Sequence, residues 1–210
     1  MGLARNLERL DLFDQAVSAL RSRYESSETF NPKLVLEYAI ALLATNKSGE
    51  ALKVIETANK QKLNSDERGK LLYLKVKAMA NVGMFDAALK LLQGDDSDIA
   101  SRMRAGLYWK AEKWAKAADS LWAILDKQKE KEKDPELLMS YALMLYKAQD
   151  FPKLQEIRKR YIKQVEGTKF KEPFMVFTSQ NLASTPSLDQ LNLHLDQVGD
   201  FEVLLEAKAK

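Results

Sequence analysis

The sequence predicts an all-α protein, a solenoid of stacked helical hairpins that ends in a helical cap. Ala, Leu, Lys and Glu dominate its 210 residues, with only eight Gly and five Pro, and this composition favours helix. A nine-residue pattern also occurs five times. Its copies start 35, 37, 29 and 37 residues apart, a period typical of helical repeats. The copies begin at Leu12, Lys47, Met84, Lys113 and Asp150.

Each copy is predicted to form the second helix, helix B, of a hairpin whose first helix, helix A, precedes it. In the first hairpin, residues 3–10 are a truncated helix A and residues 12–20 are helix B. In the second hairpin, Asn31 is placed to cap helix A and Pro32 suits its first position. Residues 46–49 are the predicted turn between this helix A and its helix B.

The third and fourth hairpins have equally clear boundaries. Asn64 and Glu67 have the spacing of a capping box, which predicts the start of a helix A there. Gly83 is expected to end that helix, and Gly94 to stop the following helix B early. This early stop explains the short spacing of 29 residues. Acidic residues at 95–98 then suit the N-terminus of the fourth helix A.

The rest of the chain contains a charged run, a fifth hairpin and a different tail. We interpret residues 127–133, which alternate Lys with Gln or Glu, as a solvated helix end. Asp134 and Pro135 repeat the chemistry of the second hairpin and open the fifth. In the tail, residues 173–177 could form a short helix, and apolar residues at helical spacing predict another over 188–198.

Four columns of residues are shared by the hairpins. They are a small residue in helix A, an aromatic residue at the turn, a small residue early in helix B and a large apolar residue one turn later. The columns are Ala4, Ala39, Ala105 and Ala142; Phe13, Phe85, Trp114 and Phe151; Ala16, Ala51, Ala88 and Ala117; and Leu20, Ile55, Leu92 and Leu121. The exceptions, one in each column, are Val76, Ser48, Leu154 and Arg158. Small residues at these places let two helix backbones approach closely.

This set of columns resembles the tetratricopeptide (TPR) repeat over residues 3–163. The resemblance implies a right-handed superhelical solenoid of TPR-like helix-turn-helix repeats with a helical C-terminal cap. Residues 1–164 would form about five hairpins, the first one truncated, and residues 165–210 a divergent helical cap. The arrangement is similar to the C-terminal part of large bacterial TPR proteins, especially alphaproteobacterial ones.

Arrays of this family bind ligands on the inner, concave surface, which helix A residues form. Mapped by the repeats, the residues expected on this surface mix Lys and Arg with aromatic and aliphatic side chains. They are Leu36, Ile40, Lys70, Tyr73, Lys77, Arg102, Trp109, Lys110, Leu143, Tyr146 and Lys147. Such a surface suits an acidic or aromatic peptide, unless its aromatic residues only fill gaps between repeats and its cations are merely solvated. The family's carboxylate clamp is not expected, because Leu36 and Ile40 occupy two of the corresponding positions.

Several other functions are disfavoured. A net charge of +3 from 33 basic and 30 acidic residues does not indicate a nucleic-acid partner, and the basic cluster at residues 158–163 is interpreted as solvated surface. Without Cys and with the single His194, the chain offers no thiolate or multi-histidine metal site, and no cofactor is expected. No apolar stretch approaches the roughly 20 residues that span a bilayer.

The leading hypothesis is therefore a noncatalytic protein-interaction module, a scaffold or adaptor that binds a peptide or helix of a partner. The alternative is a structural spacer or capping segment of a longer TPR array. An enzymatic function would require the tail to form a pocket against the repeats. The open N-terminal end could support a homodimer or stack on a preceding repeat. The compartment is left open between the cytoplasm and the bacterial periplasm.

Overall fold

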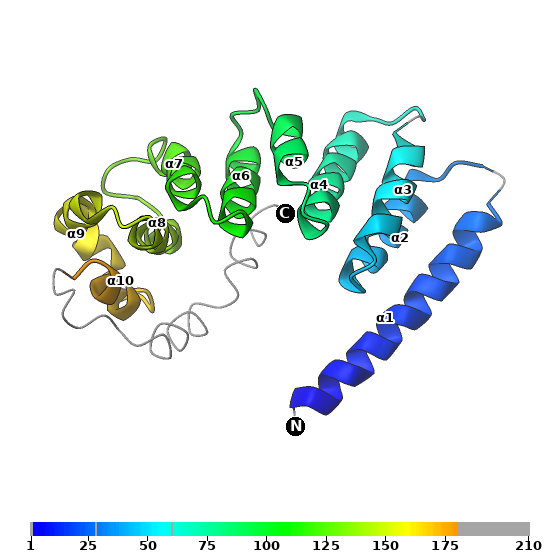
Figure 1. The fold of residues 1–210 in the computed structure, drawn as a ribbon, viewed down its shortest axis with the longest axis horizontal. Helices are drawn as coiled ribbons and strands as arrows, with labels where there is room; N and C mark the ends of the chain where they lie inside the picture. The colour runs from blue at the N-terminus through cyan, green and yellow to red at the C-terminus, as the bar shows by residue number, and fades with distance from the viewer. Residues whose placement is uncertain (1, 28, 60, 180–210) are drawn as a thin grey trace. The chain divides into compact units, whose positions relative to one another are not determined.

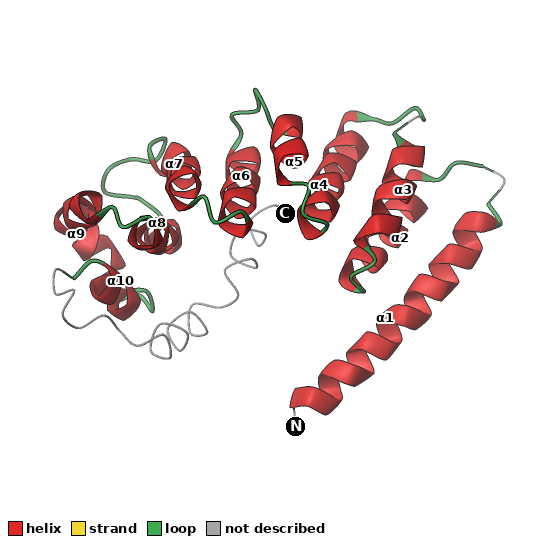
Figure 2. Cartoon of the chain, viewed as in Figure 1, coloured by secondary structure: helices red, strands yellow, loops and turns green. Residues whose placement is uncertain are grey.

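The structure of the protein is a computed structural model that describes residues 2–27, 29–59 and 61–179, with side chains from residue 12 onward. In these ranges the chain forms ten helices and no strand, as predicted for an all-α protein (Figures 1 and 2). The helix predicted over 188–198, and with it His194, lies outside the described residues. Two compact units can be distinguished, Met1–Leu91 and Leu92–Lys210, which we call unit 1 and unit 2.

Unit 1 contains five helices that pack in sequence order, each against the next, and α2 also contacts α4. Its core includes the fully buried side chains of Ala39, Leu42 and Ile55. The helices are α1 (Gly2–Glu25), α2 (Pro32–Ala44), α3 (Ser48–Ala58), α4 (Ser65–Asn81) and α5 (Phe85–Leu91).

Unit 2 contains the other five helices of the described chain. Helices α6 to α9 pack in sequence order, and α10 packs against both α8 and α9. Its core is centred on α8, from which the side chains of Leu137 to Leu145 are all buried. The helices are α6 (Asp98–Lys110), α7 (Trp114–Leu125), α8 (Pro135–Lys147), α9 (Phe151–Val165) and α10 (Lys171–Phe177), the last of which confirms the short helix expected at 173–177.

The helix starts that the sequence predicted are confirmed at atomic detail. The Asn31 side chain accepts a hydrogen bond from the Leu34 amide at 3.2 Å. Asn64 and Glu67 form both bonds of the capping box, each at 2.9 Å. Asp134 caps α8 through the Glu136 amide at 3.0 Å. These side chains satisfy amides that have no partner within the first helical turn.

All four helix A–helix B turns after α1 have the same backbone geometry. One residue in each turn has a positive φ: Asn46 at 58°, Gly83 at 78°, Glu112 at 56° and Gln149 at 57°. The amide of the next residue bonds to the carbonyl five residues earlier, for example Lys113 to Tyr108 at 2.8 Å. This is the Schellman motif, in which a left-handed residue ends one helix and directs the chain into the next. The sequence period therefore corresponds to a repeated structural unit.

The small residues of the sequence pattern are fully buried where each helix A meets its helix B. Ala105 and Ala117 are both 0% exposed, and so are Ala39 and Ala51. A larger side chain at these positions would hold the two backbones apart. In the exceptional hairpins, Val76 and Leu154 are also buried, at 3% and 2% exposure.

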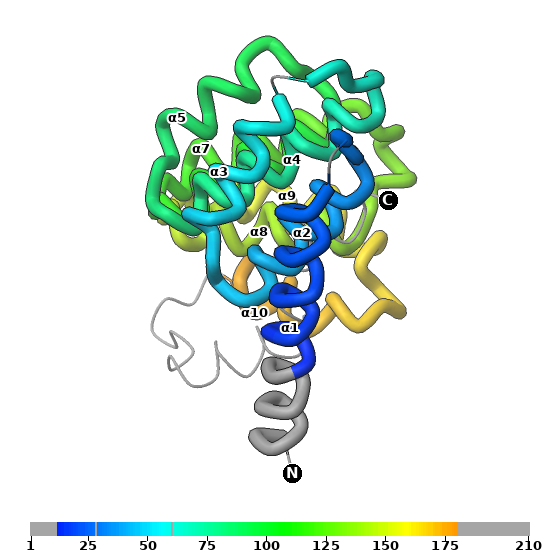
Figure 3. Tube along the Cα trace, turned by 90° about the vertical axis from the view of Figure 1, so that its right-hand side faces the viewer, coloured from blue at the N-terminus to red at the C-terminus, as the bar shows by residue number. Residues whose placement is uncertain are grey.

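The first hairpin predicted from the sequence is wrong, because α1 is one continuous helix across residues 2–25. Figure 3 draws its residues from 12 onward as a single unbroken helical tube. Asp11 stands where the other hairpins have their positive-φ residue. A left-handed non-glycine residue costs about 1–2 kcal/mol and breaks regular helical hydrogen bonds. A helix A of only residues 3–10 has little apolar surface to compensate for that cost.

The positive-φ residues allow a test of the turn geometry. Replacing Glu112 by Gly is expected to raise the free energy of unfolding of unit 2 by about 0.5–1 kcal/mol. Glycine adopts φ near 56° without strain. The strain energy that the substitution removes exceeds the greater entropy that glycine loses on folding. Urea denaturation followed by tryptophan fluorescence reports on unit 2, because Trp109, Trp114 and Trp122 are the three Trp of the chain.

The neighbouring substitution Ala111→Gly is the matched control. Ala111 has φ −87°, which any residue adopts, so glycine there gains nothing and destabilises the unit. Equal destabilisation by both glycines would contradict the turn geometry.

Candidate partner-binding surface

In unit 1, the residues predicted to contact a partner lie on α2 and α4, which pack against each other. Leu36 and Tyr73 are half-buried at the edge of the core. Ile40 is 54% exposed and Lys77 is half-buried. Lys70 is exposed and pairs with a carboxylate one turn earlier on α4. Unit 1 therefore presents apolar and cationic side chains at the predicted positions, and Ile40 is the most exposed apolar one among them.

In unit 2, four predicted residues lie at the C-terminal ends of α6 and α8. Trp109 and Tyr146 are half-buried, and Lys110 and Lys147 are exposed. They occupy equivalent places in their hairpins, two and three residues before the positive-φ residue. The structure therefore leaves the two lysines exposed and the two rings half-buried at equivalent places.

Two of the predicted contact residues in unit 2 are buried instead. Arg102 is 8% exposed and Leu143 is 1% exposed. Met139, the repeat equivalent of Arg102 in α8, is also 1% exposed, so this position faces the packed side of helix A. Leu143 belongs to the core cluster that includes Phe174 of α10. The prediction that Arg102 and Leu143 are available to a partner is wrong.

Three half-buried aromatic residues of unit 2, together with Lys147 and the buried Phe177 of α10, form a row of ring contacts. The Trp109 ring packs edge-on against Trp114, with centroids 4.8 Å apart. The Lys147 ammonium lies 5.8 Å from the centroid of Trp114, within range of a cation–π interaction. Tyr146 packs edge-on against Phe177, with centroids 5.4 Å apart. We call these five residues the aromatic row.

Trp114 is the member of the row that the sequence analysis did not assign to the binding surface. The repeat pattern identified it as the aromatic residue of the turn, which fills the hinge. In the structure it is half-buried and in contact with both Trp109 and Lys147. Its position two residues after the positive-φ residue Glu112, which brings α7 back to the end of α6, is the signal that could have identified it.

Positive charge surrounds the row. Residues 108–116, which join α6 to α7, contain three Lys and one Glu, a net charge of +2. Lys110, Lys113 and Lys116 are all exposed, and the Lys116 ammonium lies 5.8 Å from the centroid of the Tyr108 ring. Lys147 adds a further cation beside Trp114. Half-buried indole rings with lysines around them favour a ligand that carries both apolar and acidic groups.

The charged run at residues 127–133 is not a solvated helix end, because α7 ends at Leu125 and the run forms a loop. Lys133 is 5% exposed. Its ammonium donates hydrogen bonds to the carbonyl oxygens of Leu125 at 2.8 Å and Gln128 at 3.1 Å. It also lies 5.6 Å from the Trp122 ring centroid and 5.8 Å from that of Tyr161. The predicted solvation of Lys133 is wrong, since the folded loop supplies its partners.

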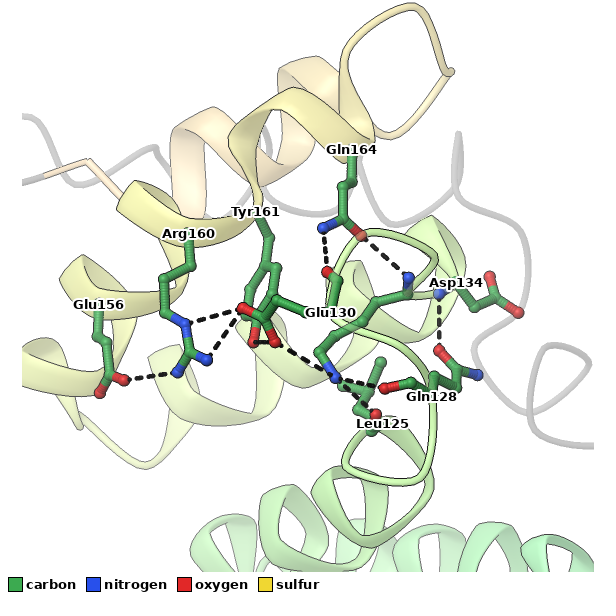
Figure 4. A network of polar contacts seen from close by, with 9 residues as sticks. Leu125, Gln128, Glu130, Asp134, Glu156, Arg160, Tyr161 and Gln164 are labelled. Atoms are coloured by element: carbon green, nitrogen blue, oxygen red, sulfur yellow. Dashed lines mark hydrogen bonds and ion pairs between the residues drawn. The ribbon is translucent and has the colours of Figure 1, made fainter.

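The same loop is attached to α9 by polar contacts (Figure 4). The Gln164 side chain donates to the Glu130 carbonyl at 2.6 Å and accepts from the Lys133 amide at 3.0 Å. The Glu130 carboxylate accepts from Tyr161 at 3.2 Å and from Arg160 at 3.1 Å. These bonds give the loop a structural role, because they attach the connection between α7 and α8 to α9.

The basic cluster at residues 158–163 is partly used inside unit 2. Arg158 donates to the Met175 carbonyl of α10 at 3.2 Å, and Arg160 pairs with Glu130 and Glu156. Tyr161 is fully buried. The interpretation of this cluster as solvated surface therefore applies to Lys159, Lys163 and the ion-paired Arg160, which are exposed. It does not apply to the half-buried Arg158 or the buried Tyr161.

Tyr141 gives unit 2 a predicted pH dependence. Burial, and then the negative charge of nearby carboxylates such as Asp119, raise the pKa of its phenol above the usual value of about 10. Below that pH the phenol is protonated in both the folded and the unfolded chain. Above it, the unfolded chain loses the proton first, so the free energy of unfolding falls as the pH rises.

We therefore expect Tyr141→Phe to lose less stability than the parent chain between about pH 8 and about pH 11. Urea denaturation at both pH values, followed by tryptophan fluorescence, measures the two losses. Equal losses in the two proteins would show that Tyr141 is not the titrating group.

No protein-family model, no curated protein and no solved structure matches this chain. Within the described ranges, no helix has the length and apolar character needed to cross a bilayer.

Proposed function

We propose that this chain is a noncatalytic protein-interaction module whose aromatic row binds an extended peptide or a helix of a partner. The observation that carries the proposal is the Trp109–Trp114–Lys147 contact set, half-exposed at the end of two neighbouring hairpins. Trp and Tyr dominate binding energy at protein interfaces because they bury large area with few rotatable bonds. The lysines around them would pair with acidic groups of the partner.

The helical hairpins support the proposal through their rigidity. Each of the four Schellman turns ends one helix and starts the next at a defined angle, so the aromatic side chains are held by packed helices. The finer form of the proposal is that the hairpins belong to a right-handed TPR-like superhelix. In such repeat proteins, binding surfaces extend over several hairpins.

The test is binding by the full chain and by a Trp109→Ala/Lys147→Glu variant. With the chain as bait, we expect a partner to be retained by the parent protein and lost by the variant, by at least about tenfold in dissociation constant. The dissociation constant is then measured by calorimetry with a synthetic peptide from that partner. Circular dichroism and urea denaturation establish that the variant is folded.

Lys131→Glu is the matched control. Lys131 is exposed in the loop before α8, and its replacement by Glu changes the charge by the same amount as Lys147→Glu. A partner bound equally by the parent chain, the variant and this control would place the binding surface elsewhere and overturn the assignment to the aromatic row.

A second candidate, a capping segment of a longer helical array, is favoured by one observation. Helix α10 covers the helix A side of α8, where Met139 and Leu143 are each 1% exposed. This is how a terminal element shields the last apolar face of a repeat array. If the chain is such a capping segment, the binding test finds no partner that depends on Trp109 and Lys147, because the segment has no ligand of its own.

A further inference from the structure

The chain already covers part of its own helix A surface. Phe174 and Phe177 of α10 are 0% and 2% exposed, and they share a core cluster with Leu143 of α8. Phe177 also contacts Tyr146, and these two residues are the α10 end of the aromatic row. The described part of the chain ends at Ser179, two residues after Phe177.

The sequence that follows α10 has the chemistry that the row would bind. Residues 180–207 contain five acidic side chains and no Lys or Arg, a net charge of −5 with His neutral. Leucine and valine recur at helical spacing in this segment, which predicts an amphipathic stripe. The stripe is Leu188, Leu191, Leu195 and Val198, and the acids are Asp189, Asp196, Asp200, Glu202 and Glu206.

The row and its surroundings are complementary to that segment in both charge and apolarity. The 108–116 segment carries a net charge of +2, and Lys147 is also exposed. The indole rings of Trp109 and Trp114 supply apolar surface between these cations. The residues before the stripe, 180–184, could extend over roughly 17 Å, so the segment has chain length to reach past Phe177.

We propose that residues 185–206 dock on the aromatic row as an intramolecular occupant, which a partner must displace. The row would then bind acidic amphipathic segments in general, with the chain's own segment as the resident one. Docking multiplies the apparent affinity for a partner by the fraction of molecules in which the row is free. If the segment is docked nine-tenths of the time, partner affinity falls about tenfold.

The test uses the full chain without any partner. Leu191→Asp/Leu195→Asp places two charges in the apolar stripe, whereas Gln190→Asp/Gln197→Asp adds the same two charges on the opposite side of the predicted helix. Acrylamide quenching of tryptophan fluorescence reports on unit 2, since the chain's three Trp lie at 109, 114 and 122. We expect the stripe variant to show stronger quenching and emission at longer wavelength, and the control to match the parent chain.

A second arm supplies the segment separately. A synthetic peptide of residues 180–210 is expected to reduce quenching in the stripe variant and to have little effect on the parent chain, whose row is occupied. Unchanged quenching in the stripe variant, or equal changes in both variants, overturns the proposal. Quenching in the parent chain that rises on dilution also overturns it, because the occupant would then be the segment of a second copy.

This inference rests on the aromatic row as a binding surface but not on any external partner. The fluorescence test therefore remains decisive for the docked segment even if no external partner is found. Conversely, a partner that binds parent and stripe variant with equal affinity supports the proposed function and contradicts the resident occupant.

Discussion

Replacing Lys133 by methionine is expected to lower the free energy of unfolding of unit 2 by about 2–4 kcal/mol. The substitution keeps the apolar stem of the side chain but removes an ammonium that is 5% exposed. The carbonyl oxygens of Leu125 and Gln128 lose a charged donor at 2.8 and 3.1 Å. The contacts with the Trp122 and Tyr161 rings are lost as well.

The measurement is urea denaturation followed by tryptophan fluorescence, with Lys131→Met as the matched control. Lys131 is exposed two residues away in the same loop, and its substitution is expected to change stability by less than about 0.5 kcal/mol. If Lys133→Met is as mild as this control, the loop does not depend on the buried ammonium.

Replacing Phe174 by alanine should have a still larger effect, a loss of about 3–5 kcal/mol. Phe174 is 0% exposed and packs in the core cluster of unit 2 with residues of α8 and α9. Helix α10 has only seven residues, so its own hydrogen bonds cannot hold it in place once this side chain is removed. We expect α10 to separate from α8 and expose Leu143.

Urea denaturation measures the loss, and hydrogen exchange of the α10 amides measures the separation. Glu172→Ala, an exposed substitution on the same helix, is the control and should leave both nearly unchanged. Protected α10 amides in the Phe174→Ala protein would contradict the view that this one side chain anchors the helix.

The helix boundaries were predictable because they depend on residues close together in the sequence. Asn31, Asn64 and Asp134 cap the helices that they were expected to cap, since a cap bonds an amide two or three residues away. Gly83 lies two residues after the end of α4 and Gly94 three residues after the end of α5, with φ of 78° and 80°, which glycine adopts without strain. Alanine pairs such as Ala105 and Ala117 marked the close contacts between helices.

The candidate site was only partly predictable. Repeat mapping placed Trp109, Lys110, Tyr146 and Lys147 at accessible helix ends, because equivalent positions in a repeat have the same orientation. It failed for Leu143, whose exposure depends on α10, an element outside the repeat pattern. It also failed for α1, because a turn at Asp11 would require left-handed backbone without enough packing to stabilise it.

The sequence by itself determined the all-helical character, the period of the hairpins and most of their caps, because each follows from interactions within about five residues. Only the tertiary structure decided that Lys133 is buried, that Arg160 pairs with Glu130, and that Trp114 joins Trp109 and Lys147. These contacts join residues on different helices or loops. Their formation depends on how whole elements pack, which no local pattern specifies.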